Sequence, residues 1–338
     1  MICILVSFLH TIYDIKCNNY VYSFKYLIMD ALTNILSSLK MEGGVSYRCE
    51  FSAPWGMKIG QTQVAEFHII VRGNCWLKMA EEAEPIHLQS GDLLVFPHGH
   101  GHELLDFPTS KTTPAEEIVG EKEIQHYGPV TFGNGGVPAT LLCGYFKFDT
   151  HVQHPLLESL PSYIHIRGTD AMEFSLLQST INFISFETKE QRPGHQAVVK
   201  RLVEVLFIQI LRAYIAQSKM PIGILTAIAN PKIGMALNSM HQHLEQNWTL
   251  DKLAKQAGMS RSAFAMRFHE LTGQTTIHYL TFCRMSQAKD LLISTNSSMS
   301  KISESVGYQS EAAFSKAFKK NLGIAPGSYR RKSSLTNI

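Results

Sequence analysis

The pattern of apolar and polar residues changes period near residue 195. Before that point, short apolar or alternating runs such as AEFHIIVRG, CWLKM and ATLLCGYFKFD are separated by Gly, Asn, Ser and Asp, which predicts β-strands joined by turns. The polar stretch 108–128 has no periodicity and predicts a long loop. After residue 195 the apolar residues follow a helical period. The sequence therefore predicts a strand-rich N-terminal part and an all-helical C-terminal part.

The first helical segment, HQAVVKRLVEVLFIQILRAYIAQ, is apolar on nearly all sides. Such a helix must be buried on more than one face. It can pack against the strand-rich part and also against a second subunit, which predicts a homodimer; a core helix of a monomer is the alternative. We assign residues 195–219 to this packing or dimerisation helix, and residues 220–235, which contain Pro221 and Pro231, to a linker.

The N-terminal 28 residues are apolar, but His10, Asp14 and Lys16 interrupt them. They lack a basic start and a small-residue cleavage site, and they are too interrupted to span a bilayer. Met29 opens the segment MDALTNILSSL, which predicts a helix over 31–39. We therefore interpret residues 1–28 as a mis-assigned start or a loose tail, and expect no membrane association.

Charge is distributed unevenly along the 338 residues, a length that suits about two domains. Residues 231–332 carry 14 Lys and Arg against 6 Asp and Glu, a balance of +8, whereas the rest carries 17 against 22. A basic third on an acidic body indicates a polyanionic partner, with nucleic acid first; chance clustering of surface lysines is the alternative. The six cysteines form no CxxC pair, which excludes a disulfide framework or zinc ribbon and fits a reducing cytoplasm.

The basic third contains one unit twice, LAKQAGMSRSAFAMRFHELTG (253–273) and ISESVGYQSEAAFSKAFKKNLG (302–323). Each copy reads as a short helix, a turn glycine, a Ser-capped second helix and a terminating glycine. This is the pattern of a helix-turn-helix. The segment TTIHYLTFCRMSQAKDLLIST (275–295) predicts one amphipathic helix that joins the two copies. Two such units about 34 Å apart can enter successive major-groove turns of DNA.

Paired phenylalanines at i and i+4 direct one face of each second helix to the core, Phe264 and Phe268 in one copy and Phe314 and Phe318 in the other. The opposite faces are then free to contact DNA, although a solvated surface is the alternative. The candidate DNA-binding residues on or beside these faces are Arg261, Ser262, Ala265, Met266 and Arg267 in the first copy, and Glu311, Ser315, Lys316, Lys319 and Lys320 in the second.

Residues 236–332 resemble the DNA-binding domain of AraC/XylS-family transcription regulators. The segments WTLDKLAKQAGMS, RMSQAKDLL and ISESVGYQSEAAFSKAFKKNLGIAPGSYRR carry the resemblance. It implies two helix-turn-helix units on double-stranded promoter DNA, with bases read by Ser262, Ala265 and Met266 and by Glu311, Ser315 and Lys316. The first set has few hydrogen-bonding side chains, so methyl contacts and DNA shape would contribute. Family members mostly activate genes, so we expect an activator that works with RNA polymerase.

The strand-rich part contains a spacing that resembles cupins, which are small β-barrels. Gly91, Pro97, Gly99 and His102 fit the pattern G-x5-P-x-G-x2-H, and Glu66-Phe67-His68 occupies the place of the earlier cupin motif. Alternate residues of a strand share a face, so Glu66 and His68, together with His102, could form a two-histidine, one-carboxylate site for a divalent metal. The alternative is a barrel that retains the turn without metal. His98 and His100 are expected to be exposed.

Two cysteines suggest a redox signal. Cys49 lies beside Arg48, and Cys143 lies in the strand-like segment TLLCGYF. A sensor cysteine is usually exposed and near positive charge. Residues 29 to about 190 also resemble, more loosely, the input domain of RclR-type regulators, which respond to reactive chlorine species. This likeness would carry redox sensing onto Cys49 and Cys143; two packed thiols in a barrel that binds a small molecule are the alternative.

The sequence therefore predicts a mixed fold: an N-terminal cupin-like β-barrel (29–190) and a C-terminal all-α domain (236–332) with two helix-turn-helix units joined by a long helix. The predicted function is a non-enzymatic, cytoplasmic transcription regulator whose barrel senses a signal. The alternatives are a small-molecule-responsive regulator without redox sensing, a metal-dependent cupin enzyme tethered to DNA, and a DNA-binding protein whose barrel only dimerises.

Overall fold

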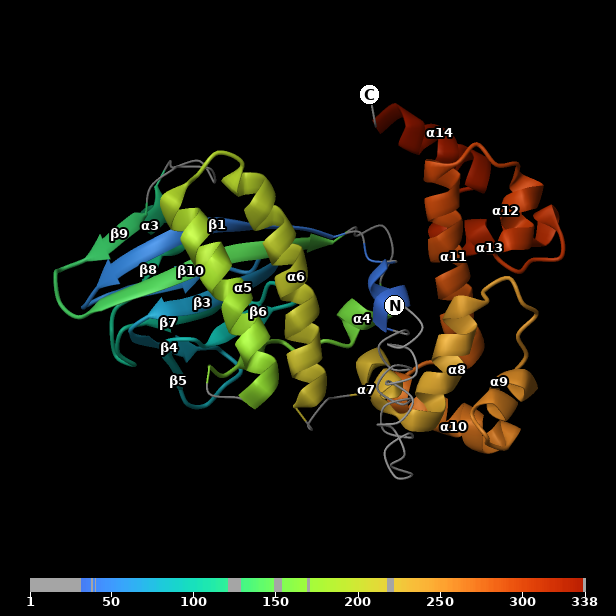
Figure 1. The fold of residues 1–338 in the computed structure, drawn as a ribbon, viewed down its shortest axis with the longest axis horizontal. Coiled ribbons are helices and arrows are strands. Elements are labelled where there is room, and N and C mark those ends of the chain that lie inside the picture. Colours follow the sequence, from blue (N-terminus) through green and yellow to red (C-terminus); the bar gives the residue numbers. More distant parts are fainter. Residues whose placement is uncertain are drawn as a thin grey trace, which may run out of the picture. The chain divides into compact units, whose positions relative to one another are not determined.

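The computed structural model describes residues 32–37, 39, 41–120, 129–148, 154–168, 171–217 and 222–336. The predicted tail, residues 1–28, lies outside them. The chain divides into two compact units (Figure 1). One spans residues 39–221, and the other comprises residues from 222 onward together with the helix at 32–37. Among the described helices, none is long and apolar enough to cross a membrane.

Within the described residues of the first unit, eleven strands form two sheets, with the orders β11-β6-β3-β10-β1-β9 and β5-β4-β7-β2-β8. Most neighbouring strands are antiparallel, and β9 and β8 pair parallel to β1 and β2 at the sheet edges. The strands are β1 (Met41–Ser52), β2 (Gly56–Ile59), β3 (Ala65–Arg72), β4 (Asn74–Lys78), β5 (Ile86–Gln89), β6 (Leu93–Phe96), β7 (His102–Leu105), β8 (Thr113–Pro114), β9 (Val130–Gly133), β10 (Pro138–Phe148) and β11 (Ile164–Ile166).

The core of this unit lies between the two sheets. Side chains alternate along each strand, so every second residue faces the interior. From the first sheet the interior receives residues such as Phe51, Ile70 and Leu141, and from the second it receives Leu77 and Leu104. All of these side chains are almost fully buried. The two facing sheets are the cupin-like architecture that the strand pattern predicts.

The outer face of the first sheet is covered by two long helices, α5 (Ala171–Glu190) and α6 (His195–Ala216), which lie side by side over β1 and β10 (Figure 1). Phe207 of α6 packs on Phe146 and Phe148 of β10, with ring centroids 5.0 and 5.2 Å apart. Gly43 permits the close approach of α6 to β1, because a Cβ there would lie 2.5 Å from Val203. One face of the predicted helix is therefore buried against its own barrel.

The polar stretch predicted as a single long loop holds short elements instead. Residues 113–114 pair with β2 as strand β8, and α3 (Ala115–Val119) adds about one helical turn. The pattern missed them because so short an element contains no full period of either kind. Between β10 and α5 the chain forms α4 (Pro155–Glu158) and the edge strand β11.

Asp92 connects the turn before β6 to β11. Its carboxylate accepts hydrogen bonds from the backbone N–H groups of Gln89 and Gly168, at 3.1 and 2.8 Å, and lies 3.0 Å from His165 Nε2. Burial by itself would raise the pKa of Asp92, but these hydrogen bonds outweigh burial and lower it. The buried carboxylate is thus fully partnered, which holds the Ser-Gly-Asp turn that opens the second cupin motif.

The second unit is helical throughout its described residues, which confirms the mixed fold class. Each copy of the repeated unit is a helix-turn-helix, formed by α9 and α10 and by α12 and α13, and the single helix α11 joins them (Figure 1). Helices α7 and α8 occupy much of the stretch 220–235 assigned to a linker. The helices are α7 (Ile224–Ala229), α8 (Pro231–Gln242), α9 (Leu250–Gln256), α10 (Arg261–Thr272), α11 (Thr276–Ser294), α12 (Met299–Ser305), α13 (Glu311–Leu322) and α14 (Pro326–Thr336).

The two copies share their caps as well as their order. Ser260 and Ser310 each accept a hydrogen bond from the backbone N–H three residues on, and so cap α10 and α13. Gly273 and Gly323 end these helices in the left-handed conformation, with φ of 73° and 76°. The repeat therefore specifies the same local structure twice.

Candidate nucleic-acid interface and barrel site

The second helix of each unit, α10 or α13, buries one face and exposes the other. Phe264, Phe268, Phe314 and Phe318 are all fully buried, as their spacing predicts. Of the ten candidate DNA-binding residues, Ala265 and Ser315 are half-buried and the other eight are exposed. Met266 is the most exposed of the large apolar side chains of α10, with 62% of its surface exposed. Both outer faces can therefore reach a ligand.

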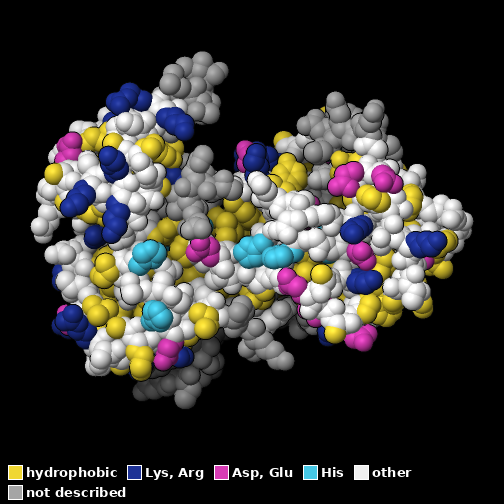
Figure 2. All heavy atoms as spheres, turned by 180° about the vertical axis from the view of Figure 1, so that it is seen from behind, with side chains coloured by type: hydrophobic (Ala, Val, Ile, Leu, Met, Phe, Trp, Pro, Cys, Tyr) yellow, Lys and Arg dark blue, Asp and Glu magenta, His cyan; other side chains and the backbone are white. Residues whose placement is uncertain are grey.

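The two faces differ in charge pairing. Arg261 lies 3.4 Å from Asp251, and Arg267 lies 3.1 Å from Glu270, so both arginines of the first unit have carboxylate partners. Among the described residues, Lys316, Lys319 and Lys320 of α13 have no acidic partner within ion-pair distance. Figure 2 shows Lys and Arg side chains gathered over the part of the helical unit that contains α12 to α14. Positive charge is therefore more available on the second helix-turn-helix than on the first.

Two arginines that the sequence reasoning did not assign bind backbone carbonyl groups of neighbouring segments in the helical part. Arg284 of α11 donates hydrogen bonds to the carbonyl oxygens of Leu244 and Gln246, at 3.0 and 2.6 Å, and its guanidinium lies over the ring of Tyr308. Arg330 of α14 donates in the same manner to the carbonyl oxygens of Leu292 and Ser297, at 3.2 and 2.7 Å. Each arginine satisfies carbonyl groups near the end of a preceding helix, α8 or α11. Both arginines lie in the segments that resemble the AraC/XylS family, and this resemblance was the sequence signal that could have identified them.

Inside the barrel, Glu66 and His68 of β3 meet His102 of β7 across the two sheets. One ligand atom from each of the three residues lies within 4.8 Å of the others. His68 Nε2 is 2.8 Å from His102 Nε2, and the His102 ring stacks on Phe96 at 3.7 Å. His102 Nδ1 donates to the carbonyl oxygen of His100 at 2.9 Å. The spacing-based triad is therefore brought together in space.

This triad has the chemistry of a divalent-metal site. Burial, and then repulsion from His102, lowers the pKa of His68 well below its ordinary value, and burial lowers the pKa of His102 to about 4. Both rings are therefore neutral at pH 7, the form that binds metals. Burial raises the pKa of Glu66 to about 7, and the buried Glu66 Oε2 has no hydrogen-bond partner among the described residues. Two nitrogens each about 2.1 Å from a tetrahedral ion lie about 3.4 Å apart, so the two Nε2 atoms, now 2.8 Å apart, fit such an ion after moving apart by about 0.6 Å.

The two candidate redox cysteines lie beside this triad. Cys143 of β10 is the register partner of His68, and its Sγ lies 3.1 Å from His68 Nδ1. Cys49 of β1 lies diagonally from Cys143 on the neighbouring strand, with its Sγ 3.9 Å away. Both thiols are buried, so neither has the exposure expected of a sensor cysteine. The contact with Cys49, followed by burial, raises the pKa of Cys143 well above its ordinary value.

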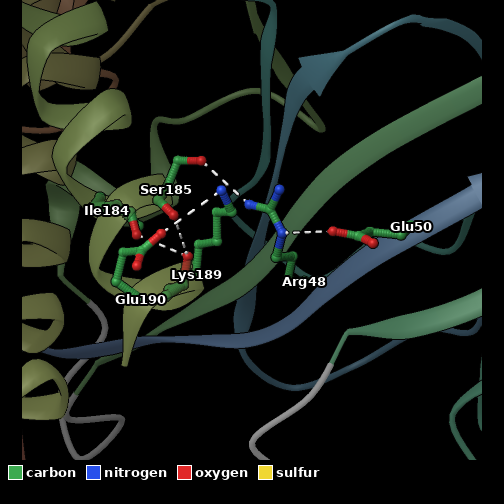
Figure 3. A network of polar contacts seen from close by, with 7 residues as sticks. Arg48, Glu50, Ile184, Ser185, Lys189 and Glu190 are labelled. Carbon is green, nitrogen blue, oxygen red and sulfur yellow. Dashed lines mark hydrogen bonds and ion pairs between the residues drawn. The ribbon is translucent and has the colours of Figure 1, made fainter. Parts of the chain in front are cut away.

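Arg48 does not supply positive charge to the Cys49 thiol, because strand alternation places the two side chains on opposite faces of β1. Arg48 lies on the outer face, 3.1 Å from Glu50 and 3.3 Å from Ser185 of α5 (Figure 3). It lines a cavity of about 470 Å³ between β1 and the α5–α6 pair, together with Tyr145 and Lys189. The reason for placing a sensor thiol at Cys49 is therefore corrected, and the outer cavity is a feature that the sequence did not indicate.

The remaining candidates divide between core and surface. His98 is exposed and His100 half-buried, so the expectation of exposure holds for His98 alone. His98 Nε2 lies 2.9 Å from the carbonyl oxygen of Leu160. Cys75 and Cys283 are buried thiols within the barrel and helical cores, respectively.

Known protein families match both the strand-rich part and the helical part of the chain. A family described as Cupin matches residues 30–216, and a family described as Helix-turn-helix domain matches residues 253–332.

Curated relatives are similar along nearly the whole chain. An uncharacterized HTH-type transcriptional regulator of Haemophilus influenzae is 31% identical, covering 91% of this chain and 100% of that protein. A putative AraC-like transcription regulator of Streptomyces antibioticus is 30% identical, with 90% and 99% covered. The RCS-specific HTH-type transcriptional activator RclR of Escherichia coli is 26% identical, with 90% and 98% covered.

Solved structures of other proteins also match this chain. The DNA-binding domain of AdpA, solved in complex with a target DNA, is 30% identical, covering 30% of this chain and 91% of that chain with a TM-score of 0.29. ToxT of Vibrio cholerae is 12% identical, covering 86% and 94% with a TM-score of 0.32.

Replacing Arg284 tests its role in joining the two helix-turn-helix units. Arg284→Ala removes two hydrogen bonds to carbonyl oxygens and the packing on Tyr308, so we expect the free energy of unfolding to fall by about 1–3 kcal/mol. Urea unfolding followed by far-ultraviolet circular dichroism measures the change. Arg267→Ala is the control, because its exposed ion pair contributes only about 0–1 kcal/mol. Equal stability of the two variants would contradict the assignment.

Proposed function

This chain belongs to the AraC family of helix-turn-helix transcription regulators and carries a cupin domain, and from that premise we propose that its barrel senses an oxidant. Oxidation of the barrel then changes how the helical part binds promoter DNA. The duplicated, Ser-capped helix-turn-helix is the observation that supports the DNA-binding half most directly. Relatives along nearly the whole chain are named transcriptional regulators, which agrees with the expectation of a non-enzymatic protein.

We assign base contacts to the N-terminal halves of α10 and α13. Ser262, Ala265 and Met266 contribute from the first unit. From the second, Glu311, Ser315 and Lys316 contribute hydrogen-bonding groups. The exposed methionine suits contact with a thymine methyl group rather than hydrogen bonding.

We assign the phosphate contacts to the cations around these faces: Arg261 and Arg267 in the first helix-turn-helix, and Lys319 and Lys320 in the second. The arginines must exchange their carboxylate partners for phosphate, whereas the lysines have none to give up among the described residues. Most of the salt-dependent affinity is therefore assigned to the second unit.

We infer that the protein is a homodimer joined through the outer face of α5 and α6. Leu176 and Phe183, seven residues apart on α5, are 64% and 61% exposed. Phe186, Val198 and Val205 extend the same apolar face. The opposite face of both helices is buried against the barrel, so a partner subunit would bury the second apolar face.

The sensing step is assigned to Cys49 and Cys143. With one hypochlorous acid, the two thiols give a disulfide, one chloride, one water and one proton, so two electrons pass from the sulfurs to the chlorine. The sulfurs must approach from 3.9 Å to about 2.05 Å, which displaces β1 and β10 relative to each other. Because α6 packs on β1 and, through Phe207, on β10, the displacement reaches the helix that leads out of the barrel. The name of the RclR relative supports this chemistry.

We also infer that Glu66, His68 and His102 hold a divalent metal. The orphaned Glu66 oxygen and the two neutral imidazoles support this site. Bound metal would stabilise the barrel and supply a positive charge beside the thiols.

A small-molecule effector is the second candidate signal, and the cavity of about 470 Å³ between β1 and α5–α6 favours it. Arg48 and Lys189 line this cavity (Figure 3); they pair with Glu50 and Glu190 and would exchange these carboxylates for an anionic group of the effector.

We infer activation rather than repression, which requires contact with RNA polymerase. The RclR relative is named a transcriptional activator, which supports this inference. In vitro transcription with purified polymerase distinguishes the two by the sign of the change in transcript.

The assignment of α13 is tested by two lysine variants. Lys316→Ala should reduce discrimination between specific and unrelated DNA by about 1–3 kcal/mol, because it removes a base contact. Lys319→Ala should weaken binding evenly to all sequences and reduce the slope of log K against log salt by about 1, because it removes a phosphate contact. Gel shifts at several salt concentrations measure both effects. If neither variant changes binding, the face assignment is wrong.

The dimer interface is tested by placing a charge within the apolar face. Phe183→Asp should convert the protein from dimer to monomer in sedimentation velocity, because an unpaired carboxylate would be buried at the interface. Phe107→Asp is the matched control, since Phe107 is 60% exposed in a loop away from these helices. A monomeric wild-type protein would refute the proposal.

The thiol switch is tested by gel shift on the promoter before oxidation, after mild hypochlorite, and after hypochlorite followed by reductant. We expect a reversible change in DNA affinity that disappears in Cys49→Ser and in Cys143→Ser. Cys75→Ser should respond like the wild type, because this buried thiol is not part of the Cys49–Cys143 contact. Unaltered DNA binding by the oxidised wild type would exclude the switch.

A further inference from the structure

An unbroken line of polar contacts inside the barrel joins the thiol pair to the metal-ligand candidates. Cys49 Sγ lies 3.9 Å from Cys143 Sγ, and Cys143 Sγ lies 3.1 Å from His68 Nδ1. On the other side of the same ring, His68 Nε2 lies 2.8 Å from His102 Nε2. His68 therefore presents one ring nitrogen to a thiol and the other to a second imidazole.

The hydrogen positions along this line follow from its last acceptor. His102 Nδ1 faces the carbonyl oxygen of His100 at 2.9 Å, and a carbonyl can only accept. Nδ1 of neutral His102 therefore carries the hydrogen, and its Nε2 is bare. The contact between the two Nε2 atoms then requires the hydrogen of His68 to lie on Nε2. His68 Nδ1 is left bare, and it accepts the S–H hydrogen of Cys143.

Metal binding requires the opposite arrangement at His68. A cation held by Glu66, His68 and His102 needs a bare Nε2 on both rings, so the His68 hydrogen must move to Nδ1. The reduced Cys143 thiol opposes this move, because its S–H bond to Nδ1 stabilises the other tautomer. A disulfide sulfur has no hydrogen to donate, and it leaves His68 free to adopt the metal-binding tautomer.

We propose that the reduced Cys143 thiol locks the barrel's metal site through His68, and that oxidation to a Cys49–Cys143 disulfide releases the lock. The inference rests on the thiol switch and the metal ligands proposed above. One neutral hydrogen bond corresponds to about a five- to tenfold change in an equilibrium constant, so oxidation strengthens divalent-metal binding by about that factor. By linkage, the metal favours the disulfide equally, and a tenfold effect lowers its reduction potential by about 30 mV.

The test is the affinity of the full-length protein for Zn²⁺, measured by isothermal titration calorimetry. Reduced protein and protein oxidised with mild hypochlorite are both desalted before titration under nitrogen. We expect the oxidised protein to bind Zn²⁺ about five- to tenfold more tightly than the reduced protein. His102→Ala should abolish binding in both states, which assigns the measured heat to this site.

Two substitutions of Cys143 separate the thiol hydrogen from the presence of a sulfur atom. Cys143→Ala removes the donor and should bind Zn²⁺ as tightly as the oxidised wild type, without any oxidant. Cys143→Ser retains an O–H donor toward His68 and should keep the weaker affinity before and after oxidant treatment. Cys75→Ala, the same truncation at another buried cysteine of the barrel core, should behave like the wild type.

Three results would overturn the lock. The first is reduced protein that binds Zn²⁺ at least as tightly as oxidised protein, and the second is failure of both states to bind it. The third is sulfur-to-cobalt absorption in the near ultraviolet from the Co²⁺ complex of the reduced protein, which would make the thiols ligands rather than a lock. Gel shifts in the presence of a chelator distinguish failure of the metal-site lock from failure of the thiol switch. If DNA binding still depends on oxidant when the metal is removed, the thiol switch holds even where the lock fails.

Discussion

The two-residue alternation of side chains along β1, β3 and β10 is the constraint on which the sensor half depends. It directs Phe146 outward onto Phe207 of α6, with Phe67 packed on Phe146, and turns His68 and Cys143 inward. A shift of one residue in register would exchange these two sets, placing imidazole and thiol under the helices and phenylalanine in the site. The apolar packing of α5 and α6 on the sheet therefore also specifies the polar chemistry inside the barrel.

The interior polar groups stay uncharged because the surrounding core is apolar and buried. Burial keeps both imidazoles neutral and keeps the Cys143 thiol protonated, so the groups meet as hydrogen-bond partners rather than as ions. In a low-dielectric core each such hydrogen bond has a defined direction, and reversing one affects its neighbours. Oxidation of the Cys143 sulfur can therefore change which ring nitrogen of His68 carries the hydrogen.

The DNA-binding half solves a different problem, which is size. A helix-turn-helix of about 20 residues cannot bury enough apolar surface to be stable alone. Here α11 contributes buried side chains along its length, including Tyr279 toward the first unit and Met285 and Leu292 toward the second. Arg284 then links carbonyl groups in the segment just before α9 to Tyr308, just before α13. The separation of the two reading helices is consequently set by one continuous helix.

The sequence by itself determined the elements whose causes are local: the strand-to-helix change of period, the duplicated caps and glycines, and the outward faces of α10 and α13. It also indicated the grouping of Glu66, His68 and His102 through the spacing of two motifs. Only the tertiary structure placed Cys49 and Cys143, 94 residues apart, in contact, and turned Arg48 away from them. Register between β1, β10 and β3 decided this, and register depends on many cross-strand contacts rather than on any one segment. Local sequence sets which way a side chain points, whereas packing of the whole sheet decides what it meets.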